Sequence, residues 1–176
     1  DILRKIHASK GVYAVNGNHE THHGYLHLEN QADDFYKSLN ICLLSDSVLV
    51  IDDQLALIGR VDSTRKFQRK TLDELTQNVS KEVPSILLDH QPADLQAAQR
   101  CGVDLQLSGH THNGQLFPMN LWQWATCLLT GKLHYGYRKV GNTQYYVTSG
   151  LGGSGEPVRV GTTGEIVLLK LKHSAY

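Results

Sequence analysis

The stretch DLQLSGHTHNGQ, residues 104–115, contains the pattern that decides the fold. Residues 104–107 form a short run with Leu105 and Leu107, which we expect to be a β-strand in the interior of a sheet. Gly109, His110 and His112 follow this run closely. Paired histidines between glycines seldom serve packing, and imidazole nitrogen is a good ligand for zinc, iron and similar divalent metals. The stretch therefore predicts a buried strand that leads into a functional loop.

Two other segments have the same arrangement of an apolar run followed by polar residues. Residues 12–15 lead into NGNHE, residues 16–20, and residues 85–88 lead toward His90. In an open α/β sheet, ligands bind beyond the carboxyl ends of the strands. We therefore expect the three polar clusters to lie close together in space, although they are far apart in the sequence.

The rest of the chain alternates short strands with helices, which predicts a layered α/β fold. We expect helices at residues 2–10, 31–38, 68–78 and 93–100, a hairpin joining 47–51 to 54–59, and later strands at 144–148 and 165–172. A glycine-rich loop, residues 150–155, lies between the last two strands. The sequence contains no internal repeat or low-complexity linker, so residues 1–176 are predicted to form one domain.

The composition excludes several classes of protein. The chain has 17 basic and 17 acidic residues, and this zero net charge argues against a general nucleic-acid-binding face. Its three cysteines are widely spaced and form no C-x-x-C pair, so neither a disulfide framework nor a zinc knuckle is indicated. The longest apolar stretch, residues 121–129, is too short to span a bilayer. Ten histidines, in contrast, direct attention to metal binding.

The three polar clusters also carry a family resemblance. GNHE at 17–20, LDHQP at 88–92 and GHTHNGQ at 109–115 resemble, in this order, the later motifs of the calcineurin-like metallophosphoesterases. The tail at 135–171 resembles the bacterial membrane-tethered or exported branch of that family, so the resemblance covers nearly the whole chain. It implies an α/β/β/α layered sandwich and a hydrolase that cleaves phosphomonoesters or phosphodiesters.

The same resemblance assigns roles to five residues. Asn18, His90 and His110 would bind one divalent metal ion, His112 would bind a second, and His19 would stand beside the scissile phosphate and protonate the leaving oxygen. The ions would be manganese, iron or zinc. Two such ions about 3.5–4 Å apart generate the nucleophile and clamp the attacking and leaving oxygens. The expected partner is a phosphate-ester substrate, either a small molecule or a lipid-linked one.

The sequence departs from the family pattern at its beginning. The opening motifs of the family, D-x-H and G-D-x-x-D, are absent, and with them the aspartate that bridges the two metals. The chain also opens inside a helical pattern, without an N-cap or a signal-peptide pattern. We therefore expect the C-terminal part of a longer membrane-associated or exported enzyme, impaired when alone. Two other interpretations stay open: a non-catalytic module that binds a single metal, and an inactive fragment.

Other residues carry weaker hypotheses. Asp62, after an apolar run, could reach the site from another strand end, whereas residues 65–70 are expected to form a solvated helix start. His22 and His23 are expected in a solvated loop. Trp122, Trp124, Leu128 and Leu129 would belong to the core, to a covering flap, or to a surface that meets lipid or an amphipathic substrate.

Overall fold

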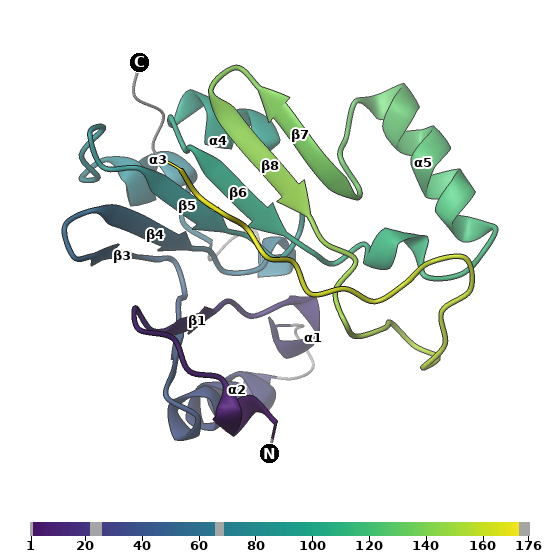
Figure 1. Ribbon diagram of the computed structural model, residues 1–176, viewed down its shortest axis with the longest axis horizontal. Coiled ribbons are helices and arrows are strands. Elements are labelled where there is room, and N and C mark those ends of the chain that lie inside the picture. Colours follow the sequence, from purple (N-terminus) through teal and green to yellow (C-terminus); the bar gives the residue numbers. More distant parts are fainter. Residues whose placement is uncertain (1, 22–25, 66–68, 173–176) are drawn as a thin grey trace.

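Two β-sheets organise the molecule, as the computed structural model of residues 2–21, 26–65 and 69–172 shows (Figure 1). The larger sheet has the strand order β3-β4-β5-β6-β8-β7. Its strands are β3 (Ser47–Ile51), β4 (Leu55–Gly59), β5 (Ser85–Leu88), β6 (Leu105–Ser108), β7 (Gly136–Val140) and β8 (Thr143–Val147). The four central strands run parallel, and β3 and β7 pair antiparallel at the two edges. This arrangement, with its helices, confirms the predicted α/β class.

The smaller sheet pairs β1 (Val12–Ala14) with β2 (Ile41–Leu43) in parallel. Figure 1 shows this sheet below the larger one, together with α1 (Asn18–Thr21) and α2 (Leu26–Ser38). The helix expected at residues 31–38 is thus the second half of α2. The helix expected at residues 2–10 is wrong, because only a 3₁₀ turn forms at Leu3–Lys5. Ile2, Leu3 and Ile6 are exposed there and bury no helical face.

Local signals explain most of the remaining elements. The hairpin of β3 and β4 turns through Asp52 and Asp53, and both have the left-handed backbone that aspartate tolerates better than most residues. The other helices are α3 (Leu72–Thr76), α4 (Leu95–Arg100) and α5 (Met119–Thr130). Helix α3 begins at a capping box, in which Thr71 and Glu74 exchange hydrogen bonds, so it is shorter than the expected 68–78.

The C-terminal third differs from the expectation in two ways. The hairpin partner of β8 is β7, and residues 165–172 form no strand. Figure 1 shows this last segment, in yellow, crossing in front of the larger sheet. In addition, residues 119–130 form the helix α5. The apolar run at 121–129 had left open whether this segment belongs to the core, to a covering flap or to an exposed surface. Short apolar runs do not separate these alternatives because their periodicity is ambiguous.

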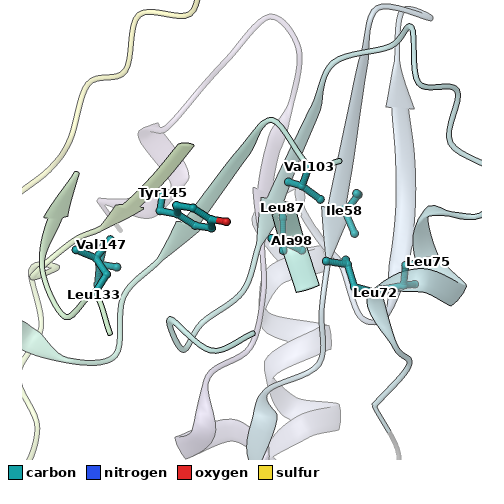
Figure 2. Packing of buried hydrophobic residues seen from close by; sticks show 9 residues of the cluster. All are labelled: Ile58, Leu72, Leu75, Leu87, Ala98, Val103, Leu133, Tyr145 and Val147. Atoms are coloured by element: carbon teal, nitrogen blue, oxygen red, sulfur yellow. The ribbon is translucent and has the colours of Figure 1, made fainter. Parts of the chain in front are cut away.

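The hydrophobic core lies between the larger sheet and helices α3 and α4. Figure 2 shows its members, which are Ile58, Leu72, Leu75, Leu87, Ala98, Val103, Leu133, Tyr145 and Val147. The hydroxyl of Tyr145 donates a hydrogen bond of 2.7 Å to the carbonyl oxygen of Leu95, which joins β8 to α4. This packing holds the central strands in place, and with them the carboxyl ends of β5 and β6.

Candidate metal centre

Three polar side chains from distant segments meet beyond the carboxyl ends of the strands. Nε2 of His90 lies 3.0 Å from Oδ1 of Asn18, and Nδ1 of His110 lies 3.1 Å from the same oxygen. The two ring nitrogens are 3.2 Å apart. His90 follows β5 and His110 follows β6, both in the larger sheet, whereas Asn18 is the first residue of α1, which follows β1 of the smaller sheet. We call these three residues the donor triad.

A glycine makes room for the donor triad. A Cβ atom on Gly17 would lie 2.8 Å from Cε1 and 2.9 Å from Nε2 of His90, closer than real side chains approach. The backbone N–H of Gly17 donates a 2.9 Å hydrogen bond to Oε2 of Glu20, which helps to turn the chain into α1. Only a residue without a side chain can therefore bring Asn18 against the ring of His90.

The segment after β6 is strained. His110, His112, Asn113 and Gln115 all have positive φ angles, between 48° and 70°, and Gly114 between them has a φ of 77°. A left-handed residue other than glycine costs about 1 kcal/mol, and such strain concentrates at functional sites. The tight turn projects the rings of both histidines toward the same pocket.

Burial disfavours the protonated form of the histidines. It lowers the pKa of His90 and of His110, and the carboxylate of Asp62 acts in the opposite direction on both. Burial also lowers the pKa of His112, and the nearby guanidinium of Arg159 lowers it further. A neutral imidazole offers a nitrogen lone pair to a metal, so these shifts favour the form of the side chain that can be a ligand.

The triad has the spacing of ligands around one ion. Donors about 2.1 Å from a metal lie about 3–3.5 Å apart at neighbouring corners of an octahedral or tetrahedral site. The separations of 3.0, 3.1 and 3.2 Å fall in this range. Within the described residues no group of three His, Cys, Asp or Glu side chains is placed to hold a metal, because the third donor here is the amide oxygen of Asn18. The chemistry of the donor set fits a borderline divalent ion.

A pocket of about 280 Å³ surrounds the triad and also contains the other two predicted site residues. His19 lines it and is exposed at its rim. His112 lines it as well, but its Nδ1 faces Nη2 of Arg159 at 3.4 Å rather than the triad. All five residues that the sequence singled out thus lie at one pocket, with three of them in mutual contact.

The far wall of this pocket comes from the glycine-rich loop, which sequence reasoning noticed without placing it there. Gly153 and Ser154 line the pocket. Gln115 holds the loop, because its amide donates to the carbonyl oxygens of Ser154, Glu156 and Val158 and accepts from the N–H of Ser154. No local pattern connects residue 115 with a loop about 40 positions later, so this wall was missed.

Arg159 is the second anchor of the same loop. Its guanidinium donates to the carbonyl oxygens of Ser149 at 2.7 Å and Gly150 at 3.2 Å, and also to that of Gly152. It further donates to the carbonyl oxygen of His112 at 3.0 Å. Arg159 therefore connects the pocket wall to the strained segment that carries the histidines.

Two carboxylates, Glu20 and Asp62, act on the triad through their charge. Glu20 lines the pocket and was quoted only as part of a motif. Asp62 is fully buried, and both its oxygens accept hydrogen bonds from the side-chain amide of Gln91, at 3.0 and 3.1 Å. Its charge acts to raise the pKa of His90 and of His110, and it follows β4 in the chain without being one of the residues that line the pocket.

Residues 66–68 of the expected solvated helix start at 65–70 lie outside the described residues, and the side chain of Arg69 is not solvated. Arg69 is buried and pairs with the fully buried carboxylate of Asp89, which Arg60 approaches at 3.5 Å. Burial raises the pKa of Asp89 to about 6, and the two guanidinium groups act in the opposite direction. The sequence of a basic segment does not indicate which of its residues will pair with a buried carboxylate.

The remaining histidines stay away from the triad or outside the described structure. His134 is half-buried, and its carbonyl oxygen accepts a hydrogen bond from Thr111. His7 is exposed near the N-terminal turn. The hypotheses on His22 and His23 fall outside the described residues, as does His173.

Comparison with known proteins gives a consistent result. Residues 2–114 match the calcineurin-like phosphoesterase family. An uncharacterized metallophosphoesterase of Helicobacter pylori is 34% identical over 173 residues, which cover 96% of this chain and 45% of the relative. An uncharacterized metallophosphoesterase of Aquifex aeolicus is 31% identical over 176 residues, which cover 97% of this chain and 64% of the relative.

A third relative carries a membrane description in its name. The Bos taurus "transmembrane protein with metallophosphoesterase domain" is 31% identical over 189 residues, covering 97% of this chain and 40% of the relative. The chain thus spans between 40% and 64% of the length of these three relatives. None of the helices in the described residues is long and apolar enough to cross a membrane. No solved structure matches the chain.

Proposed function

The chain belongs to the calcineurin-like phosphoesterase family, and from this membership we propose that it supplies part of a metal-dependent centre that hydrolyses phosphate esters. The observation that carries the proposal is the donor triad, in which two imidazoles and an amide oxygen are held 3.0–3.2 Å apart in a pocket. Three such donors from three segments have little reason to meet except around a shared ligand.

Each predicted residue has a role in this proposal. Asn18, His90 and His110 would hold one divalent ion, and His112 would contribute to a second. When bound, such ions lower the pKa of water and neutralise charge on a phosphate group. His19, exposed at the rim, would give a proton to the leaving oxygen as its bond to phosphorus breaks. Manganese, iron or zinc would all suit these ligands.

Metal stoichiometry tests the proposal directly. The chain is loaded with Mn²⁺ or Zn²⁺ and desalted, and its metal content is measured by elemental analysis. We expect His90→Ala and His110→Ala to lose the triad ion, and His7→Ala, which changes an exposed histidine elsewhere, to retain it. Hydrolysis of bis(4-nitrophenyl) phosphate is measured on the same preparations. Equal metal content in all variants would contradict the proposed centre.

A second function, a module that binds one metal without catalysis, is supported by the composition of the triad. Its three donors form one complete face of a single site, and His112 is turned toward Arg159. This alternative predicts one ion per chain and no hydrolysis, whereas a hydrolase centre completed by further residues predicts two ions and turnover.

We further propose that residues 1–176 form a single unit within a longer membrane-associated protein. The name of the bovine relative supports the membrane association.

A further inference from the structure

Helix α5 exposes an apolar face, unlike most surface helices of water-soluble proteins. Its large apolar side chains point outward, and Leu121, Trp122, Trp124, Leu128 and Leu129 are between 54% and 85% exposed. Figure 1 shows α5 at the side of the molecule, beyond β7 and β8. A surface helix normally turns its apolar stripe toward the core and its polar residues toward water.

The side of α5 that faces the protein is mostly polar. Gln123, Thr126 and Cys127 are half-buried, and Oε1 of Gln123 is buried. Asn120 donates from its side chain to the carbonyl oxygen of Gly161 at 3.4 Å, which fixes the first turn. Packing within the described structure therefore does not account for the leucines and tryptophans.

The stretch of sequence that includes α5 carries charge of one sign only. Residues 105–155 contain no aspartate or glutamate, although the whole chain is neutral. The basic residues of that stretch lie just after the helix. Lys132 and Lys139 are exposed, and Arg138 donates to the carbonyl oxygen of Gly131 at the helix end. The exposed apolar residues of α5 are thus followed in the sequence by basic residues, with no acidic residue in the same stretch.

We propose that α5 docks on the surface of a membrane that contains anionic lipids. With 12 residues, and so about 18 Å of length, the helix lies in the plane of the interface rather than across it. The leucines enter the boundary between headgroups and acyl chains, and the tryptophans sit at headgroup level, as such rings do in membrane proteins. Lys132 and Lys139 attract the anionic headgroups. The acid-free charge pattern favours this partner over a second copy of the neutral chain.

The unmodified chain provides the first test. Trp122 and Trp124 are its two tryptophans, so tryptophan fluorescence reports on α5 alone. Vesicles of phosphatidylcholine with 30% phosphatidylglycerol, about one lipid in three, supply the anionic surface. We expect the emission to shift to shorter wavelength with these vesicles, and brominated acyl chains to quench it. An unchanged spectrum overturns the proposal. So does a shift that follows protein concentration without lipid, because that would indicate self-association.

Variants that keep both tryptophans can distinguish the contribution of apolar burial from that of positive charge. Leu128→Ala/Leu129→Ala should weaken vesicle binding at least about tenfold, because apolar burial drives insertion. Ile166→Ala/Leu168→Ala, which changes equally exposed side chains in another segment, should leave binding unchanged. Lys132→Gln/Lys139→Gln should weaken binding to anionic vesicles about tenfold, and Lys5→Gln/Lys81→Gln serves as its control. Equal effects of a pair and its control would overturn the proposal. Thermal unfolding checks that each variant is folded.

This inference stands apart from the proposed hydrolysis. Vesicle binding needs neither the donor triad nor a metal, so it is measured in the presence of a chelator. A chain that binds metal but ignores vesicles would overturn the docking surface alone, and a chain that binds vesicles but no metal would overturn the proposed centre alone.

Discussion

Gly17 shows how a missing side chain can position a ligand. The ring of His90 occupies the space where a Cβ of residue 17 would stand, at 2.8 Å from its Cε1 atom. The neighbouring Asn18 can then place its oxygen 3.0 Å from Nε2 of that ring. The spacing of the donor triad therefore depends on a contact between a backbone and a ring, in addition to the donors themselves.

Replacing Gly17 by alanine should separate these donors. Because the new Cβ meets a ring and not a flexible chain end, we expect a loss of about 1–3 kcal/mol in the free energy of unfolding. Metal affinity should fall about 10- to 100-fold. Gly152→Ala is the matched control, since a Cβ there meets no atom within 4 Å. Titration calorimetry with Mn²⁺ compares the two, and equal affinity would show that the ring moves aside without consequence.

Metal affinity should also depend on pH in a defined direction. Burial lowers the pKa of His90 and His110, so at pH 6.5, where a free histidine is half protonated, the neutral form of both is favoured more than in a free side chain. Protons therefore compete with the metal less than they would at free histidines. The same shift stabilises the metal-free fold above the ordinary pKa, and this stability is lost as the pH falls through the lowered pKa.

Calorimetric titrations at pH 7.5, 6.5 and 5.5 check this. We expect nearly equal affinities at the two higher values and a fall at the lowest. A steep loss already between pH 7.5 and 6.5 would mean that the histidines titrate like free side chains.

At the scale of elements, the pocket wall is a loop that side chains from elsewhere hold in shape. Arg159 connects residues 149–152 to the carbonyl oxygen of His112, and Gln115 binds residues 154–158. A glycine-rich loop without such anchors would pay a large entropy cost to adopt one conformation. The two anchors therefore preorganise a wall that its own sequence would leave flexible.

Arg159→Gln should release this wall. The variant loses most of the hydrogen bonds to backbone carbonyls, and we expect the free energy of unfolding to fall by about 2–4 kcal/mol. Hydrogen exchange at residues 149–155 should become faster. Arg138→Gln is the control, because Arg138, in β7, also donates to two backbone carbonyls, and these lie just after α5. Unchanged exchange in the loop would assign its order to Gln115 alone.

At the scale of the molecule, a neutral chain conceals a very uneven distribution of charge. Arg60, Arg69 and Asp89 are buried together beside the end of β5, whereas Lys37 and Asp33 pair on an exposed face of α2. Removing one partner of a buried pair leaves a charge without compensation, while an exposed pair contributes little.

Two asparagine substitutions make this difference measurable. Asp89→Asn should lower the free energy of unfolding by about 3–5 kcal/mol. Asp33→Asn should change it by less than about 1 kcal/mol. Urea unfolding compares both with the parent chain. If the two variants are equally stable, the buried arginines have found other partners.

The sequence predicted the parts of the molecule that depend on neighbouring residues. The strand at 85–88 and the hairpin through Asp52 and Asp53 follow from local pattern and turn chemistry. The site residues were predicted from polar residues that follow strands, because parallel strands bring such residues to the same edge of a sheet. Contacts between distant segments could not be predicted, and so the burial of Arg69 and the position of the loop at 150–155 were missed.

The donor triad also has a consequence for how the molecule is held together. Asn18 belongs to the part that carries the small sheet, whereas His90 and His110 end strands of the large one. An ion shared by all three would be a cross-link between residues 72 and 92 positions apart. Occupancy would then restrict the independent motion of the two sheets and stabilise their contact in proportion to the logarithm of ion concentration. The ion would thus stabilise the contact between the two sheets in addition to its part in catalysis.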